Sequence, residues 1–220
     1  MKILVACERS GRFRDALLAL GHDAYSCDTE PTRVPGPHLQ CDVREVLADK
    51  WDGLIAHPVC KYLTNAGAKH LYRRVNGVWA KENGLEPERW RLMEEGAKFF
   101  NLFRDAVHIP RRAIENPIMH GHARALVERG APEKVRPQYA QPWWFGDAYS
   151  KATGWWLYGL PKLVRENEKT DYEKITQECW LMTPSDDREE KRSQTYPGMA
   201  RACSLQWFGT ETSRVLEAAE

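Results

Sequence analysis

The first 120 residues alternate between short apolar runs and amphipathic segments. The apolar runs predict buried strands at 2–7, 22–28, 39–43, 51–56 and 111–116. Helical periodicity predicts a helix over 11–21, which stops at a glycine, and another over 87–106, which begins with a proline. Strands and helices that alternate with short links predict an α/β fold. We expect a Rossmann-like, mostly parallel sheet with helices on both faces, which binds ligands at the carboxyl ends of its strands.

The pattern changes after the fourth predicted strand. Glycines interrupt any period in residues 64–86, which predicts an irregular segment, and we expect residues 61–86 to form a mobile loop that closes over substrate. Beyond about residue 135 the sequence is aromatic and punctuated by Gly and Pro, with a polar stretch near 165–192 that we expect to be mobile.

The length of 220 residues predicts a single domain. Residues 1–120 would form its cofactor and catalytic half, and residues 121–220 its substrate-side half. This leaves little room for a large recognition domain.

Composition narrows the class of protein. A net charge of +1 with 29% charged residues is typical of an ordinary soluble protein, and no long apolar run predicts a membrane span. The six cysteines form no CxxC pair, which argues against a zinc site and a disulfide framework and favours free thiols in a reducing cytoplasm. His120 and His122 lack a matching third ligand, so we expect no metal.

The charge is uneven along the chain, because residues 61–74 are basic and contain no carboxylate. Aromatic residues lie among the cations Lys61, Lys69, Arg73 and Arg74. Both a solvated basic loop and a contact with nucleic acid fit this pattern.

Every predicted strand ends in or near a polar residue, and in chain order these are Glu8, Asp28, Asp42, Cys60 and Glu115. The carboxyl ends of parallel strands share one edge of a sheet, so these distant residues should converge there. Acids on the second and third strands suit hydroxyl and amine donors such as a ribose and an adenine. One turn glycine, Gly11, without a phosphate-loop lysine favours a nucleoside-type ligand that lacks a pyrophosphate. Plainer interpretations stay open: Cys60 as a buried thiol, and Glu115 as a strand-end cap or ion-pair partner.

Four strings in a fixed order carry a resemblance to a known family: ACERSGRFRDAL (6–17), CDV (41–43), WDGLIAHPVC (51–60) and AIENP (113–117). They resemble the cofactor and catalytic motifs of the S-adenosylmethionine-dependent cytosine-C5 DNA methyltransferases, most closely short, phage-associated members. The resemblance covers most of the chain. It implies a class I methyltransferase fold, DNA as the partner and the cytoplasm of a bacterial host as the location.

The resemblance also implies roles for individual residues. In that family a Pro-Cys thiolate attacks C6 of a flipped-out cytosine, and a Glu contacts N3 and the exocyclic amine, before a methyl group moves to C5. This implies Cys60 as the nucleophile and Glu115, with Asn116, as the group that promotes attack. Lys151 stands where the family carries an arginine-rich motif and is its substitute. The implied cofactor contacts are Cys7, Glu8, Ser10, Gly11, Asp28, Asp42, His57 and Pro58, and the expected substrate contacts are Lys61, Lys69, Arg73 and Arg74.

The chemistry makes opposite demands on the two central groups. C5 of cytosine is a poor nucleophile, and adding a thiolate across C5=C6 makes it enamine-like. To donate a proton to N3, Glu115 should have a raised pKa in a partly dry site. Cys60 needs a lowered pKa, which His57, Lys61 or a helix N-terminus could provide. Val59 stands where the family has proline, so the loop that carries the thiol is expected to be less rigid.

Three functions are compatible with the sequence. The leading one is cytosine-C5 methylation of DNA, and the second is C5 methyl transfer to a free pyrimidine nucleotide or to RNA, which would explain the absence of a recognition domain. The third is a non-catalytic relative that binds nucleic acid or cofactor. A homodimer or a partner chain could supply target recognition.

Overall fold

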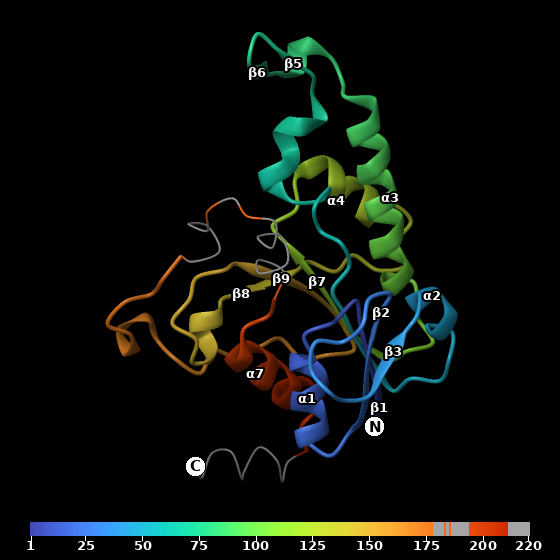
Figure 1. The fold of residues 1–220 in the computed structure, drawn as a ribbon, viewed down its shortest axis with the longest axis vertical. Coiled ribbons are helices and arrows are strands. Elements are labelled where there is room, and N and C mark those ends of the chain that lie inside the picture. Colours follow the sequence, from blue (N-terminus) through green and yellow to red (C-terminus); the bar gives the residue numbers. More distant parts are fainter. Residues whose placement is uncertain (178–182, 184, 186–193, 211–220) are drawn as a thin grey trace.

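A computed structural model describes residues 1–177, 183, 185 and 194–210 (Figure 1). Its centre is a seven-stranded sheet in the order β3-β2-β1-β4-β7-β9-β8. The strands are β1 (Lys2–Ala6), β2 (Asp23–Asp28), β3 (His38–Gln40), β4 (Gly53–Ala56), β7 (Arg111–Pro117), β8 (Gln138–Ala140) and β9 (Thr153–Tyr158). Five strands of this sheet, β1, β2, β3, β4 and β7, are parallel, and β9 pairs antiparallel with both β7 and β8.

Helices cover both faces of the sheet (Figure 1). On one face lie α1 (Arg12–Ala19) and α7 (Pro197–Phe208), and on the other lie α2 (Val43–Val46), α3 (Pro87–Arg104) and α4 (Gly121–Glu128). The short 3-10 helices are η1 (Asn65–Leu71), η2 (Lys81–Asn83), η3 (Pro142–Phe145) and η4 (Lys169–Asp171). The predicted fold class is therefore confirmed, and the described residues contain no large additional domain.

The two-residue period of the strands builds a core on each face. In β1, Leu4 belongs to the cluster beneath α3, whereas Ile3 and Val5 belong to the cluster beneath α1 and α7. Phe100 and Phe103 of α3 are fully buried, as their helical stripe predicts. Because both faces are covered, the central strands are apolar throughout.

Two predictions about local structure are wrong. The third strand ends at Gln40, and Asp42 does not lie within it but caps the N-terminus of α2. The strands β8 and β9 were not predicted, because they do not belong to the repeating strand–helix pattern of the first half of the chain. The antiparallel pairing of β9 with β7, a partner far away in the sequence, is what places it in the sheet.

We call residues 61–86 the arm, and its residues 64–86 are not irregular as predicted. They contain η1 and an antiparallel hairpin of β5 (Arg74–Val75) and β6 (Val78–Trp79), and they project beyond the sheet at the top of Figure 1. The hairpin turns at Asn76 and Gly77, whose φ angles of 50° and 82° suit a tight two-residue turn. That the arm closes over substrate stays a prediction.

The polar stretch near 165–192 lies only partly within the described residues. Residues 165–177 contain η4 and a β-bridge between Tyr149 and Thr176, and most of the remainder lies outside the description. In the part of the chain that is described, no helix is long and apolar enough to cross a membrane, and no group of three or more His, Cys, Asp or Glu residues could hold a metal ion.

Candidate active site

His57 and Glu115 meet at the carboxyl ends of β4 and β7. The parallel register places Ile55 opposite Ala113 and Ala56 opposite Ile114, so the next residues along the two strands also lie side by side. His57 Nδ1 lies 2.9 Å from Glu115 Oε2, which is a hydrogen-bond distance. Both side chains are almost buried, with exposed fractions of 11% and 12%.

The pKa of Glu115 is lowered, which contradicts the predicted raised value. Burial does raise this pKa, as the sequence argument expects, but the hydrogen bond and charge of His57 and the charge of Lys151 outweigh it. Glu115 is therefore a carboxylate and can only accept, so Nδ1 of His57 carries the proton and donates it. The second carboxylate oxygen, Oε1, makes no hydrogen bond to any described residue.

The far side of the His57 ring is packed among aromatic residues. Its centroid lies 5.2 Å from that of Phe13 and 5.9 Å from that of Trp155. His57 Nε2 is buried and has no hydrogen-bond partner within the described part of the chain. The imidazole is thus fixed by packing on one side and by Glu115 on the other.

Cys60 lies on the loop that leaves β4, three residues beyond His57. Pro58 is buried, Val59 is exposed and Cys60 is half-buried, so the chain reaches the surface within this loop. The Cys60 carbonyl accepts from the backbone N–H groups of Leu63 and Thr64, which turns the chain immediately afterwards. His57 bonds Glu115, and its expected effect on the pKa of this thiol stays a prediction.

Asn116 and Lys151 flank the pair. Asn116 is fully buried on the opposite face of β7 from Glu115, where its Nδ2 donates to the carbonyl of Pro117. Its Oδ1 is buried and has no hydrogen-bond partner among the described residues. Lys151 is close enough to lower the pKa of Glu115, and its Nζ donates to the carbonyl of Gln194 at 3.1 Å.

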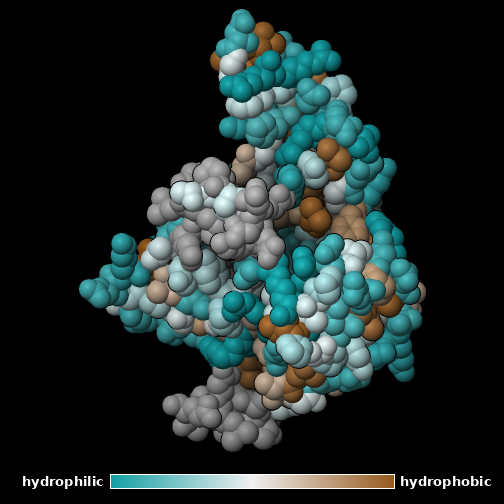
Figure 2. Space-filling model, in the orientation of Figure 1, coloured by the Kyte–Doolittle hydropathy of each residue, from teal (hydrophilic) through white to brown (hydrophobic). Residues whose placement is uncertain are grey.

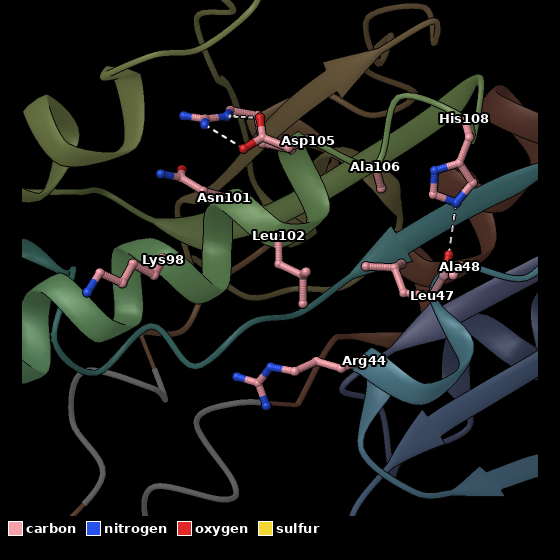
Figure 3. A pocket seen from close by; sticks show the side chains of 10 residues that line it. Arg44, Leu47, Ala48, Lys98, Asn101, Leu102, Asp105, Ala106 and His108 are labelled. Atoms are coloured by element: carbon pink, nitrogen blue, oxygen red, sulfur yellow. Dashed lines mark hydrogen bonds and ion pairs between the residues drawn. The ribbon is translucent and has the colours of Figure 1, made fainter.

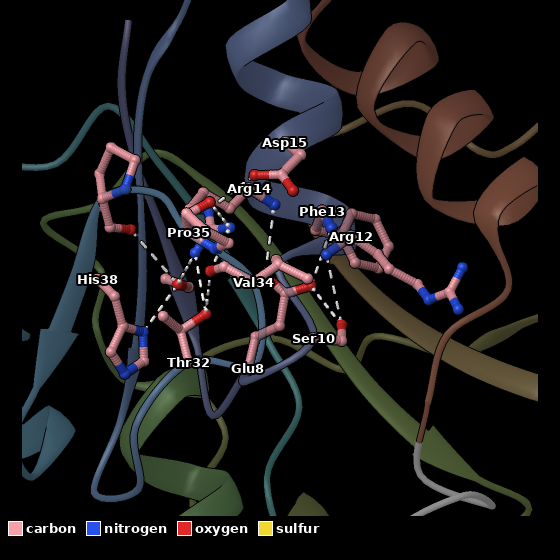
Figure 4. Close-up of polar contacts among 12 residues, drawn as sticks. Glu8, Ser10, Arg12, Phe13, Arg14, Asp15, Thr32, Val34, Pro35 and His38 are labelled. Atoms are coloured by element: carbon pink, nitrogen blue, oxygen red, sulfur yellow. Dashed lines mark hydrogen bonds and ion pairs between the residues drawn. The ribbon is translucent and has the colours of Figure 1, made fainter.

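Glu8 closes the N-terminus of α1 (Figure 4). Its Oε1 accepts from the backbone N–H of Phe13 at 2.9 Å and from the Ser10 hydroxyl at 3.1 Å, and its Oε2 accepts from the N–H of Arg14 at 3.3 Å. An anionic side chain thus already occupies the positive end of this helix. Glu8 is 5% exposed, so its carboxylate lies below the surface at the sheet edge where the sequence predicts a cofactor.

Arg14 fixes the segment that follows β2 against the start of α1. The side chain is fully buried, and each guanidinium nitrogen donates a hydrogen bond; the acceptors are Asp15, Ser26, Thr32, Val34 and Pro35 (Figure 4). Gly11 lies beneath this contact with a φ of 72°, and a Cβ there would stand 2.4 Å from Arg14 Nη2. The glycine is therefore required by the packing of Arg14 and by its own backbone.

Asp28, which ends β2, and Asp42, which follows β3, differ in how many of their carboxylate oxygens are free to bind a ligand. Asp28 accepts from Thr29 and from the N–H of Glu30 through Oδ1 alone. Both oxygens of Asp42 are engaged by Arg44, one by its N–H and the other by its guanidinium, and these contacts lower the pKa of Asp42. Cys7 lies nearby with a φ of 58°, and burial followed by the charge of Asp28 raises the pKa of its thiol.

The predicted substrate cations lie along the arm and are exposed, in the order Lys61, Lys69, Arg73 and Arg74. They are thus separate from the His57–Glu115 pair, and only Lys61 is close to Cys60 in the sequence. The arm surface is mainly hydrophilic, with an apolar spot at its end (Figure 2).

A cavity of about 610 Å³ lies elsewhere, between α2 and the C-terminal half of α3 (Figure 3). Arg44, Leu47, Lys98, Leu102 and His108 are among the residues that line it. None of the predicted site residues is in its lining, so it does not belong to the candidate active site.

Three residues of this region were missed in the sequence. Arg14, Phe13 and Trp155 all support the site, yet each looks like an ordinary residue of an amphipathic helix or an aromatic cluster. For Arg14 a signal existed: an arginine on the apolar side of a helix, next to Phe13 and Leu17, must find buried acceptors.

No family model matches the sequence, and no curated protein matches it significantly. Solved structures that align with it include a prophage-encoded E. coli protein described as a DNA modification methyltransferase. That alignment has 12% identity and a TM-score of 0.44, and covers 70% of this chain and 45% of that chain.

Two further structures are a DNMT2 mutant from Spodoptera frugiperda and the Dnmt2 methyltransferase of S. pombe. The first has 13% identity and a TM-score of 0.39, covering 75% of this chain and 53% of that chain. The second has 11% identity and a TM-score of 0.38, covering 83% of this chain and 56% of that chain. The chain therefore spans about half the length of the structures it matches.

We predict that replacing His57 by phenylalanine raises the pKa of Glu115, because burial then acts without the opposing hydrogen bond. In the native protein the carboxylate stabilises the fold above its ordinary pKa of 4.5, and this stabilisation is lost as the pH falls through the lower folded value. A carbon-13 NMR titration of the glutamate carboxyl groups measures the shift. His108→Phe, a change outside the site, should leave the Glu115 titration where it was. An unchanged Glu115 titration in His57→Phe would show that the pair is not coupled.

Arg14→Met should lower the free energy of unfolding by at least about 1.5–3 kcal/mol, the contribution of one hydrogen bond to a charged group. The reason is that the variant removes a buried charged donor that bonds four acceptors in residues 26–35. Urea denaturation gives the difference. Arg129→Met, at an exposed position, serves as the matched control and should change stability by no more than about 0.5 kcal/mol. Equal stability of the two variants would contradict the structural role of Arg14.

Proposed function

We propose that the protein transfers a methyl group from S-adenosylmethionine to C5 of cytosine in DNA through a covalent adduct with Cys60. The observation that supports this most is the pairing of two neighbouring strand ends. Cys60 lies on the loop that follows β4, and Glu115 lies near the end of the adjacent strand β7, where it bonds His57 from the start of that loop. Adjacent strands are about 4.8 Å apart, which suits two groups that act on one pyrimidine ring.

The proposed reaction assigns a step to each group. The Cys60 thiolate forms a bond to C6 of cytosine, and the electron pair of C5=C6 becomes available at C5. Glu115 has one oxygen held by His57 and the other available, and this second oxygen accepts from the exocyclic amine of the base. C5 would take the methyl group, and the sulfonium sulfur would keep the electron pair of the broken bond and become a neutral thioether. The C5 hydrogen then leaves as a proton to solvent, the electrons of that C–H bond restore C5=C6, and the Cys60–C6 bond breaks and releases the thiolate.

The cofactor edge supports a ligand without phosphate groups. A pyrophosphate is usually bound at the N-terminus of the first helix, where free N–H groups and the helix dipole attract anions. Here the Glu8 carboxylate already takes two of those N–H groups, and its charge would repel a phosphate. S-Adenosylmethionine supplies an electrophilic methyl group on a sulfonium centre, and its positive charges suit a buried carboxylate.

Asp28 and the turn at Gly11 would hold the nucleoside part of that cofactor. The Oδ2 oxygen of Asp28 makes no contact with any described residue and can accept from ribose hydroxyls. Gly11, together with the segment after β2 that Arg14 holds in place, forms the sheet edge beside β1. Asp42, whose oxygens are both engaged, would contribute more to the fold than to the ligand.

The arm supports DNA as the substrate. No carboxylate occurs between His57 and Lys81, so the loop of the nucleophile and most of the arm carry cations only. An uninterrupted basic surface attracts a phosphate backbone. This observation favours a polymer over a free nucleotide.

A duplex in which 5-fluorocytosine replaces every cytosine of one strand tests the proposal without knowledge of the target site. In the presence of S-adenosylmethionine, Cys60 should remain bonded to the base, because fluorine at C5 cannot leave as a proton does. Mass spectrometry of the intact protein detects the adduct. Cys60→Ser should give none, whereas Cys41→Ser should still form it. If the wild-type protein forms no adduct, or forms one on another residue, the proposed chemistry is wrong.

Calorimetric titration with S-adenosylmethionine tests the cofactor contacts separately. Asp28→Asn should weaken binding by about 1–3 kcal/mol, as for a buried polar partner left unpaired. Asp42→Asn should change affinity less and instead lower stability, since it removes the charge that pairs with Arg44. A larger loss of affinity in Asp42→Asn than in Asp28→Asn would assign the adenine contact to Asp42.

A further inference from the structure

A cavity of about 550 Å³ lies between the arm and the first turns of α3. It is distinct from the His57–Glu115 pair and has a lining of unusual composition. Tyr62, Tyr72 and Trp79 contribute rings, Arg74 and Arg89 contribute guanidinium groups, and Glu86 contributes a carboxylate. Aromatic rings with cations beside them are the surface on which single nucleobases stack.

The Trp79 ring is surrounded by positive charge. Lys69 Nζ lies 4.6 Å and Arg74 Cζ 4.4 Å from its centroid, and the His70 ring contacts it at 4.9 Å in a T-shaped arrangement. Burial, with the charges of Lys69 and Arg89, lowers the pKa of His70, so its ring is neutral near pH 7. A base entering here would meet flat groups and cations that can hold its phosphate.

The cavity also has a donor and an acceptor that the protein itself does not satisfy. Arg89 donates from Nη2 to the Lys61 carbonyl at 2.9 Å and lies 4.5 Å above the Tyr62 ring, but its buried Nε has no partner among the described residues. The Glu86 side chain makes no hydrogen bond or ion pair within the described chain. Arg89 and Glu86 are both partly exposed, so a nucleobase can donate to the Glu86 carboxylate and accept from the accessible part of the Arg89 guanidinium.

The cavity is formed before any ligand binds. Trp90 Nε1 donates to the Leu71 carbonyl at 2.9 Å, and the Glu86 N–H donates to the same carbonyl at 2.9 Å. These bonds fix the arm on the first turn of α3, so the rings do not need to be ordered on binding. Tyr62, which lines the cavity, lies two residues after Cys60 in the chain.

We propose that this cavity is a second nucleobase site, which stacks one unpaired base of a nucleic-acid strand beside the base that is methylated. The inference rests on the proposed function for its substrate class, a polynucleotide, and adds a site outside the catalytic one. Trp79 is the stacking platform, Arg74 holds the adjoining phosphate, and Arg89 and Glu86 contact the base edge.

Two single strands of equal length test this site: oligothymidine and an abasic strand of tetrahydrofuran phosphates. They carry the same charge and differ only in the bases, and neither contains cytosine. Fluorescence anisotropy should show that the wild-type protein binds oligothymidine about 5- to 150-fold more tightly, the range for one stacked base. Trp79→Ala should remove this preference, and Trp79→Phe should retain most of it.

Trp144→Ala, which removes a half-buried tryptophan far from the arm in the sequence, is the matched control and should keep the preference. Circular dichroism of each variant confirms that it is folded, and Arg74→Ala provides a second variant that should weaken binding of both strands. Thymidine monophosphate as a competitor distinguishes a strand from a free nucleotide. Competition at concentrations comparable to the oligothymidine would contradict a site for a strand.

Equal binding of the two strands by the wild-type protein, or a preference that survives in Trp79→Ala, overturns the proposal. The outcome is independent of the methylation chemistry, because Cys60→Ser should keep the preference for oligothymidine. A protein that forms the 5-fluorocytosine adduct but shows no preference retains only the proposed function. One that shows the preference without the adduct retains only the second base site.

Discussion

The contact between His57 and Glu115 is the interaction on which the candidate site depends. It follows from the register of β4 and β7, which brings the same-face residues beyond Ile55 and Ala113 together. A shift of one residue would turn one of the two side chains to the face covered by α3. Phe13 from α1 and Trp155 from β9 then fix the imidazole from the other side, so three parts of the chain determine the position of one carboxylate.

Charge divides the carboxyl edge of the sheet into two regions. At the proposed cofactor side, Glu8 and Asp28 provide carboxylates, and the Arg14 guanidinium donates to five other acceptors, of which Asp15 is anionic. At the substrate side the arm carries cations without carboxylates up to Lys81. A cationic cofactor and an anionic polymer can therefore approach the same edge without competing for the same charges. The strand order reverses between β1 and β4, which is the place where open α/β sheets usually bind their ligands.

The sequence was sufficient for the parallel half of the sheet, because apolar runs and amphipathic helices record burial on both faces. It was insufficient where pairing depends on distant partners, as for β9, and where a side chain satisfies backbone groups, as for Asp42 and Arg14. For Glu115 the argument from burial was correct, but the sequence could not show that His57 would bond to it. The hydrophobic periodicity of a sequence indicates which residues are buried, but it does not indicate which polar atoms a buried side chain bonds.

The central claim is that the Cys60 thiol serves a methyl transfer to cytosine in DNA. Mass spectrometry of nucleosides tests it most directly, using DNA, RNA and free nucleotide pools from cells that express the wild-type protein or Cys60→Ser. The account predicts 5-methylcytosine in DNA with the wild-type protein and none above background with the variant. It would be contradicted if the modified base were absent from DNA, appeared instead in RNA or the nucleotide pool, or formed equally with Cys60→Ser.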